Sequence, residues 1–233
     1  MIPLHDDNPT STVPVITVAV IVACTLAFLW ELSLGERALQ AAIFSLGVTP
    51  ATLVGSARLP PEMQLVPPWA TLLTSMFLHG GWMHLIGNML YLWIFGNNIE
   101  DSMGHGRFVV FYVLCGIAAA LAQAIPNPGS TIPMIGASGA ISGVLGAYLL
   151  LFPRARVLVA IPLGFFLHTV RLSAVWVLGF WFVLQLINSA LAPVDGGGVA
   201  WGAHIGGFVA GLALIPFFKH RRVRLLAPAR RRY

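Results

Sequence analysis

Charged residues are scarce in this chain of 233 residues: Asp, Glu, Lys and Arg make up 9% of it, against 58% hydrophobic residues. Soluble globular domains carry roughly a quarter charged residues, so the composition excludes that class. The mean hydropathy of +0.84 is typical of a polytopic membrane protein. The length fits one bundle with short loops rather than several domains.

Cysteine and targeting signals are scarce as well. Cys24 and Cys115 lie in apolar runs, form no CxxC pair and have no cluster of metal ligands nearby. We interpret both as packing residues, and expect no disulfide, metal or cofactor. The N-terminal segment MIPLHDDNPTST has no Lys or Arg, so we expect no cleaved signal peptide. The lack of any recognisable targeting segment fits a bacterial plasma membrane best.

Long apolar runs are what the sequence has in abundance. A transmembrane helix needs about 20 mostly apolar residues. Six stretches are candidates, the fourth of them short: Val13–Leu32, Trp82–Ile99, Phe108–Ile125, Ser138–Phe152, Ser173–Leu191 and Ala200–Phe218. The segment Ser33–Pro68 is too broken to span and is predicted to be a loop with interfacial helical pieces. We therefore predict an all-α membrane protein, a bundle of six transmembrane helices.

The basic residues predict the orientation of the bundle. If both termini are cytoplasmic, 11 of the 13 Lys and Arg residues lie inside, and Arg37 and Arg58 lie outside. The positive-inside rule favours this arrangement. The expected organisation is a cytoplasmic segment 1–12, a membrane domain 13–218 and a basic tail 219–233. The tail is expected to meet anionic lipid, and nothing indicates nucleic acid as a partner.

Small residues predict which helices touch. GxxxG pairs occur at Gly139/Gly143 in the fourth span and at Gly202/Gly206 and Gly207/Gly211 in the sixth. Helices in lipid approach closely where such residues face each other. The fourth and sixth spans are therefore expected to be in contact.

Polar residues inside the spans gather at one predicted depth. The segments HGGWMHLIGNML, GASGAISG and AHIGG place His84, Asn88, Ser138 and His204 in the outer third of the membrane. Lipid offers such groups no partners, so they mark functional sites. If the two helices touch, His204 can act as the base that activates the Ser138 hydroxyl. Asn88, His84 and the backbone N–H of Ser138 can then stabilise an oxyanion.

Each of these residues also has an ordinary interpretation. Serine is a common packing residue in membrane helices, as we expect for Ser142, which could instead line the site. His204 or Asn88 alone could be a hydrogen bond between helices. His84 with Asn88 could belong to a metal site or a proton path, but no acid or Cys lies at ligand spacing.

From about Pro68 to Phe218 the chain resembles the rhomboid intramembrane serine proteases. The motifs are HGGWMHLIGNMLYLWIFGNNIEDSMGHGRF, then GASG, then AHIGG, in this order. The resemblance implies a six-helix bundle with a water-filled cavity, and a dyad without a carboxylate, of Ser138 as nucleophile and His204 as base. It implies His84 and Asn88 as the oxyanion-stabilising pair. It also implies that the loop Leu191–Val199 and the helix Ser173–Ile187 act as gates.

Two features depart from the family. Its well-studied bacterial type has a Tyr one turn after the nucleophile, stacked on the base, where this chain has Ser142. We expect the base to be held less rigidly or to be oriented by another group. A Trp-Arg pair common in the first outer loop is also absent.

Three functions follow as hypotheses. The first is an intramembrane serine endopeptidase that cuts transmembrane proteins near the outer membrane face. The second is a catalytically inactive rhomboid-like scaffold that binds membrane clients, although such relatives usually lose the Ser or the His. The third is a small transporter or channel, for which we expect inverted halves or a deep charged residue and find neither.

Overall fold

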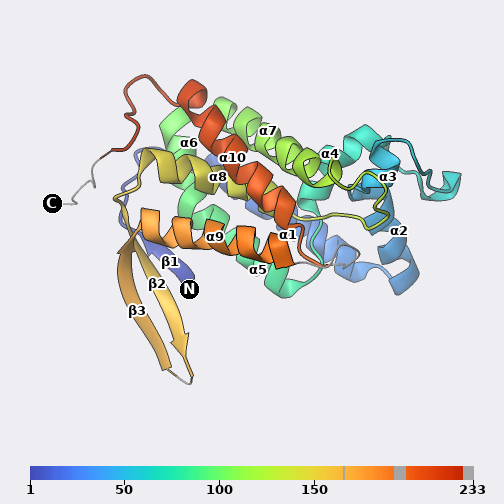
Figure 1. The fold of residues 1–233 in the computed structure, drawn as a ribbon, viewed down its shortest axis with the longest axis horizontal. Coiled ribbons are helices and arrows are strands. Elements are labelled where there is room, and N and C mark those ends of the chain that lie inside the picture. The colour runs from blue at the N-terminus through green and yellow to red at the C-terminus, as the bar shows by residue number, and fades with distance from the viewer. Residues whose placement is uncertain (165, 192–197, 228–233) are drawn as a thin grey trace.

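A computed structural model describes residues 1–164, 166–191 and 198–227, and Figure 1 shows that the chain is mostly helical. The helices are α1 (Val15–Ser33), α2 (Glu36–Leu46), α3 (Pro50–Leu53), α4 (Thr71–Thr74), α5 (Trp82–Tyr91), α6 (Asn97–Met103), α7 (His105–Ala124), α8 (Ser138–Leu151), α9 (Ala174–Leu191) and α10 (Trp201–Phe218). A π-helical segment, Leu92–Gly96, joins α5 to α6, and 3-10 turns lie at Pro61–Met63, Pro68–Ala70 and Ser75–Phe77.

Within the described residues, four helices are long and apolar enough to cross a membrane: α1, α7, α9 and α10. The α8 helix is equally apolar but shorter. The predicted span Trp82–Ile99 is formed by α5, the π-helical segment and α6 in succession, and continues to Met103. The predicted apolar segments therefore all form helices.

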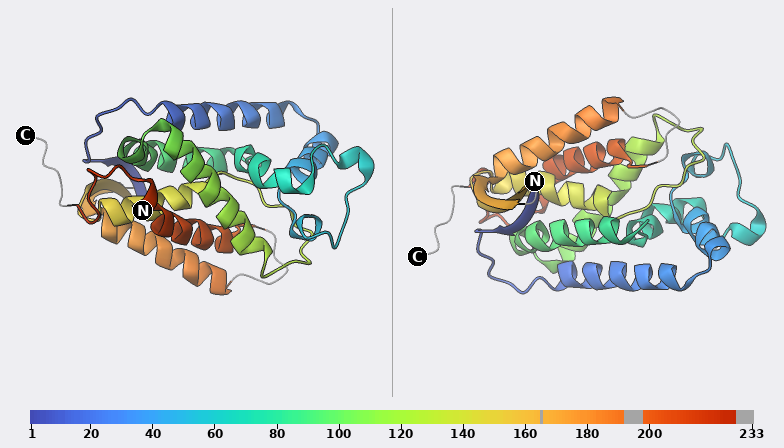
Figure 2. Two further views of the ribbon diagram at one scale, coloured as in Figure 1. Left: turned by 90° about the horizontal axis from the view of Figure 1, so that it is seen from above. Right: turned by 90° about the horizontal axis from the view of Figure 1, so that it is seen from below.

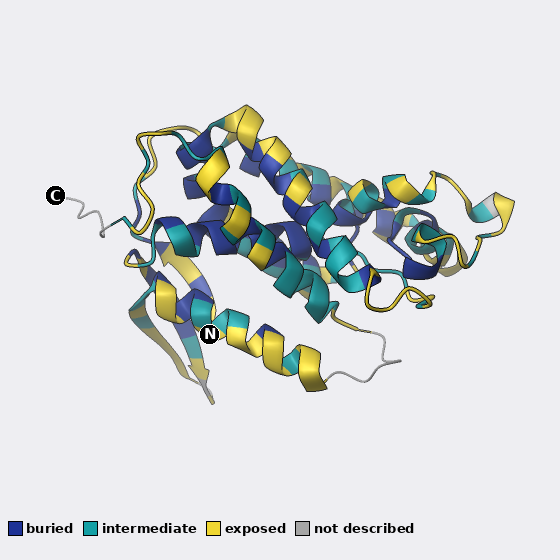
Figure 3. Cartoon of the chain, turned by 45° about the horizontal axis from the view of Figure 1, so that its top comes forward, coloured by how far each residue is buried: buried dark blue, intermediate teal, exposed yellow. Residues whose placement is uncertain are grey.

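The α8 helix is the centre of the bundle. All of its residues except Ser138, Leu149 and Leu150 are buried. Figure 2 shows α1 and α9 on opposite flanks, with α8 between them. In Figure 3 the outward faces of the flanking helices are exposed and the central helices are buried.

Glycines bring α8 and α10 into backbone contact, as the GxxxG pairs predict. A Cβ atom on Gly207 or Gly211 would overlap the carbonyl oxygen of Gly139 or Gly143, respectively. The pair Gly202/Gly206 packs elsewhere, because a Cβ on Gly206 would overlap Ala122 of α7. Larger residues at these positions would force the two helices apart.

A small sheet shows that the expectation of an all-α fold was wrong. Strands β1 (Ile2–Asp6), β2 (Arg156–Leu163) and β3 (Phe166–Ser173) form an antiparallel sheet in the order β1-β2-β3. Its apolar residues Val157 and Val159 alternate toward the core and are fully buried. The N-terminal segment is thus a strand paired with residues about 150 positions away, which no local pattern reveals.

Both ends of the described chain lie at the end of the bundle that carries the sheet. The Asp7 N–H donates to the Arg156 carbonyl at 2.8 Å, and the Leu226 N–H donates to the Leu150 carbonyl at 2.9 Å. Several helices end or begin here as well, including α6, α7, α8 and α9 (Figure 1). The short helices α2, α3 and α4 lie at the opposite end of the bundle.

A buried carboxylate fastens the start of α1 to α6. The Glu100 side chain is fully buried, and its oxygens accept the backbone N–H groups of Ile16 and Thr17 at 2.9 and 2.8 Å. It also accepts the Thr17 hydroxyl at 2.7 Å and contacts Nδ1 of His105. The carboxylate occupies the N-terminus of α1, where the helix dipole favours negative charge.

Candidate active site

Ser138 is the first residue of α8, and it is half-buried. The preceding turn depends on Gly136, which has φ +124°, a conformation that L side chains rarely adopt. The Gly136 N–H donates to the Ser75 carbonyl at 2.9 Å and fixes this turn against the chain before α5. The first N–H groups of α8 lack intrahelical partners, so the hydroxyl sits beside a region of positive potential.

The structure brings His204 onto Ser138. Nε2 of His204, one turn into α10, lies 2.8 Å from Oγ of Ser138. This distance depends on the close approach of α8 and α10 at Gly139 and Gly207, because bulkier residues there would separate the two side chains.

His84 lies on the other side of Ser138, across Gly136. The Gly80 N–H donates to Nδ1 of His84 at 3.3 Å, so the proton of the neutral ring is on Nε2. A Cβ atom on Gly136 would lie 2.7 Å from this Nε2 and 3.7 Å from Oγ of Ser138. The space over Gly136 is therefore bordered by a hydroxyl on one side and an imidazole N–H donor on the other.

His79 supports His84 in this position. The rings of His79 and His84 pack edge to face with centroids 5.1 Å apart. The His79 N–H donates to Oε2 of Glu31 on α1 at 3.1 Å, and the His79 side chain is buried. The segment before α5 is thereby attached to α1.

Asn88 lies one turn after His84 on α5 and is buried, with 8% of its surface exposed. Its amide nitrogen Nδ2 has no hydrogen-bond partner among the described residues. Leaving such a donor unpaired in a buried position costs about 1–3 kcal/mol. Among the described residues, Asn88 makes no hydrogen bond to Ser138, His84 or His204, and its Nδ2 remains unpaired.

The second nitrogen of His204 binds Gln185, a residue that no sequence pattern indicated. Nδ1 lies 2.8 Å from Oε1 of Gln185 on α9. The imidazole also packs between Trp181 of α9 and Trp201 of α10, with ring centroids 6.0 Å away in both cases. The two Trp residues of α9 differ, since Trp176 is 71% exposed whereas Trp181 is half-buried against His204.

Ser142 is a packing residue, as one of the two interpretations predicts. Its side chain is buried, and its hydroxyl donates to the carbonyl oxygen of Ser138, four residues earlier, at 2.7 Å. It makes no contact with His204 that resembles the missing Tyr.

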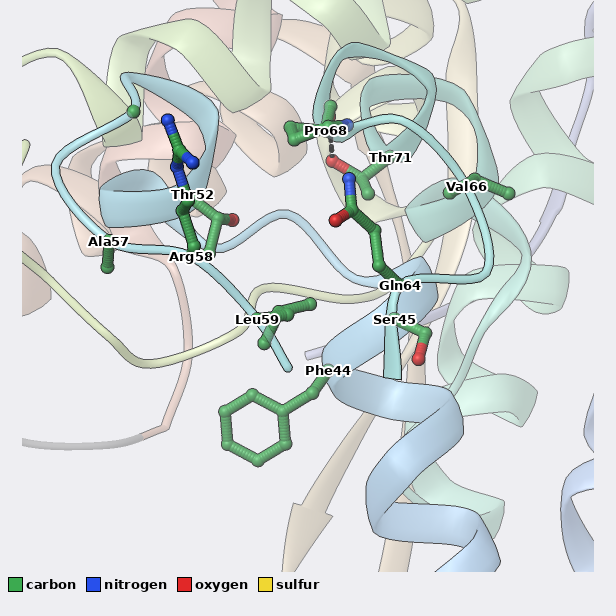
Figure 4. Close-up of a pocket in the computed structure, with 11 residues that line it drawn as sticks. Phe44, Ser45, Thr52, Ala57, Arg58, Leu59, Gln64, Val66, Pro68 and Thr71 are labelled. Atoms are coloured by element: carbon green, nitrogen blue, oxygen red, sulfur yellow. Dashed lines mark hydrogen bonds between the residues drawn. The ribbon is translucent and has the colours of Figure 1, made fainter. Parts of the chain in front are cut away.

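Within the described residues, two cavities lie toward the end of the molecule away from the sheet. A small one of about 40 Å³ is lined by Ser138, Gly136 and neighbouring residues of α7 and α10, and it has room for water. A larger one of about 310 Å³ lies among α2, α3 and the loop up to Thr71, as Figure 4 shows. The larger cavity contains none of the predicted site residues.

Comparison with known proteins identifies the family. The family model of the Rhomboid domain matches residues 67–221, more than half of the chain. The chain belongs to the rhomboid family. The matched rhomboid region contains all four predicted site residues.

Curated relatives agree with this assignment. The chain is similar to "Rhomboid protease GluP" of Bacillus subtilis, 37% identical over 150 residues that cover 63% of this chain and 26% of the relative. It is 31% identical to "RHOMBOID-like protein 5" of Arabidopsis thaliana over 61% of this chain and 42% of the relative. It is 30% identical to "Rhomboid protein 1, mitochondrial" of Saccharomyces cerevisiae, covering 61% and 40%. The match thus spans less than half the length of these rhomboid relatives, which occur in bacteria and eukaryotes.

The gate loop expected at Leu191–Val199 falls largely on residues 192–197, outside the described part of the chain.

Proposed function

We propose that this rhomboid is an intramembrane serine endopeptidase that hydrolyses peptide bonds of transmembrane proteins near the outer membrane face. The observation that carries the proposal is the 2.8 Å distance between Oγ of Ser138 and Nε2 of His204. A serine hydroxyl is a weak nucleophile until a base takes its proton, and this contact supplies the base. The similarity to a relative named as a protease, "Rhomboid protease GluP", supports the same function.

The reaction is acyl transfer to serine followed by hydrolysis. Ser138 attacks the carbonyl carbon of the substrate while its proton passes to Nε2 of His204. The carbonyl oxygen becomes an oxyanion. The C–N bond then breaks, and the proton moves from Nε2 to the leaving amine. A water molecule, deprotonated by His204, attacks the acyl ester, and the second product leaves with a carboxyl group as Ser138 regains its proton.

His84 and Asn88 are the proposed oxyanion donors. An oxygen in the space over Gly136 would be within hydrogen-bond distance of Nε2–H of His84. The free Nδ2 of Asn88 supplies a second donor, and the first N–H groups of α8 add a third. A donor that is already oriented and unpaired needs no reorganisation when the negative charge develops.

The membrane arrangement is part of the proposal. All six predicted segments cross the bilayer, including α5–α6 and the short α8, and both termini are cytoplasmic. The described sheet end then lies inside, together with Arg154, Arg156 and Arg171, as the positive-inside rule favours. The segments 1–12, 13–218 and 219–233 act as cytoplasmic strand, protease and lipid-binding tail. A bacterial plasma membrane is the proposed location.

Substrate helices must unwind at the site before they can be cut. A helical backbone hides its carbonyl groups in internal hydrogen bonds, so only an opened segment exposes one to Ser138. The small cavity beside Ser138 supplies room for the hydrolytic water. We therefore propose transmembrane proteins with small residues and helix-weakening sequence near the cut as substrates.

A cleavage assay in liposomes tests the proposal. Wild type and Ser138→Ala are incubated with a reporter transmembrane substrate, and the products are identified by mass spectrometry. We expect wild type to cut near the outer end of the reporter helix and Ser138→Ala to be inactive but folded. Cleavage by Ser138→Ala would exclude this nucleophile. A wild type that neither cuts nor reacts with a fluorophosphonate probe would favour the scaffold hypothesis.

A further inference from the structure

We propose that Gln185 is the positioning residue of the Ser138–His204 pair and does the work that a carboxylate does in a serine protease triad. The inference rests on the proposed function and names the group that orients its base. It starts from the contact between Oε1 of Gln185 and Nδ1 of His204, 2.8 Å apart.

Gln185 differs in polarity and burial from the residues around it on α9. Its neighbours Val183, Leu184, Leu186 and Ile187 all have exposed side chains, as expected for a helix on the flank of the bundle. Gln185 itself is only 5% exposed and faces the bundle. A buried amide in a membrane helix is unfavourable unless its polar atoms are paired, so its partners define what it does.

The orientation of the Gln185 amide follows from its other contact. Nε2 of Gln185 donates to the carbonyl oxygen of Trp181, one turn earlier, at 3.0 Å. A backbone carbonyl can only accept, so the amide nitrogen faces Trp181 and the amide oxygen faces His204. The oxygen in turn can only accept, and Nδ1 of His204 must therefore carry a proton.

This contact determines which nitrogen of His204 can act as a base. With the proton on Nδ1, a neutral imidazole has a bare Nε2 that accepts the proton of Ser138. The opposite tautomer would point an N–H at the hydroxyl and could not act as a base. Gln185 thus selects the competent tautomer, and Trp181, one turn earlier on α9, packs on the ring with the two planes tilted by 33°.

The departure from the family at Ser142 makes this role necessary. Ser142 bonds its own helix and does not reach the base, so the ring is held by α9 and by Trp201. The hydrogen bond lasts only while α9 is seated against α10, where Phe182 stacks on Phe208 with centroids 4.4 Å apart. The position of α9 and the tautomer of the base are thereby linked.

Gln123 offers a matched control. Its Oε1 accepts the N–H of Ala203, next to His204 on α10, at 3.2 Å, but it does not touch the imidazole. Replacing either glutamine by Leu removes one amide and one hydrogen bond to α10. Only the change at position 185 removes the partner of Nδ1.

The experiment measures kcat and KM against pH in liposomes for wild type, Gln185→Leu, Gln185→Glu and Gln123→Leu. His79 and His84, which pack on each other, are the other histidines of the site, and these variants leave both unchanged. We expect Gln185→Leu to lower kcat roughly 10- to 100-fold with KM within about 2-fold, because the base samples the wrong tautomer. Gln185→Glu keeps an acceptor, so it should restore most of kcat. Its carboxylate favours the charged imidazole and should move the acid limb of the profile up by about one pH unit.

Gln123→Leu should lower stability without changing the pH profile. Nitrogen-15 NMR of histidine-labelled protein should show His204 protonated at Nδ1 in wild type and as a mixture in Gln185→Leu. An active wild type whose Gln185→Leu variant keeps the same kcat and pH profile would overturn this inference alone. A wild type that does not cleave would overturn the proposed function, and with it the role of Gln185 in catalysis.

Discussion

Two buried polar clusters lie at opposite ends of this bundle, and their hydrogen bonds are arranged differently. Around Glu100 at the sheet end, both carboxylate oxygens are taken by Ile16, Thr17 and His105. Around Ser138 at the other end, the amide nitrogen of Asn88 is buried without a partner in the described chain. One cluster is closed, and the other keeps a donor available.

Whether its buried polar atoms have partners distinguishes a cluster that stabilises the fold from one that can bind a ligand. A closed cluster contributes to stability, because each buried group has replaced its water by a protein partner. An unpaired donor reduces stability and is retained where a ligand completes it. A buried polar group without a hydrogen-bond partner does not by itself mark a site. The Tyr112 hydroxyl, for example, is also buried and unpaired among the described residues. We propose a site at Asn88 because it lies one turn after His84 on α5, and His84 borders Ser138 across Gly136.

The largest effect is expected when the proposed base, His204, is removed. His204→Ala should lower the cleavage rate roughly 10⁴-fold or more, because the Ser138 hydroxyl loses its proton acceptor. Labelling of Ser138 by a fluorophosphonate should fall in parallel. The thermal midpoint should change little, since His204 is half-buried at a polar site. Labelling at the wild-type rate would mean that another group activates the serine.

The next largest effect is expected at the open donor. Asn88→Ala should lower kcat roughly 10²-fold, as expected for the loss of one oxyanion donor. It should not lower the unfolding free energy, because Nδ2 has no partner to lose. The rate is measured on the reporter substrate and the stability by thermal melting in detergent.

Asn98 is the matched control for Asn88. It is also buried, and its Nδ2 donates to the carbonyl oxygen of Asn8 at 3.0 Å, whereas its Oδ1 has no partner among the described residues. Asn98→Ala should therefore lower stability and leave kcat of the folded protein within about 2-fold. If the two variants behave alike in rate and melting, the distinction between open and closed clusters is wrong.

Destroying the closed cluster should affect the fold rather than the chemistry. Glu100→Ala removes the acceptor of three hydrogen bonds at the start of α1 and should lower the unfolding free energy by about 3–5 kcal/mol. Glu100→Gln keeps one oxygen and should lose less. Both should retain kcat at temperatures where they are folded. Equilibrium unfolding in mixed micelles measures the loss, and a rate defect in fully folded Glu100→Gln would contradict this prediction.

The sequence predicts the helices and the contact between Ser138 and His204 well, because the features behind them are local or repeated. Apolar runs mark the helices, and GxxxG pairs predict the contact that brings α10 to α8. The sheet was missed because β1 and β2 are far apart in the chain. Gln185 was missed for a similar reason: a single amide in an apolar helix has no pattern, and its partner is known only once α9 and α10 are placed.

The smallest effect is expected at Ser142, and it tests where the site ends. Its hydroxyl bonds a carbonyl of its own helix, so Ser142→Ala should change the unfolding free energy by less than about 1 kcal/mol and kcat by less than about 2-fold. Ser102→Ala is the control, because Ser102 makes the same bond to the Asn98 carbonyl at 2.6 Å in the closed cluster. Similar small changes in both variants would place Ser142 with the packing residues. A selective loss of kcat in Ser142→Ala would instead extend the open cluster one turn deeper along α8, where a substrate side chain would have to contact it.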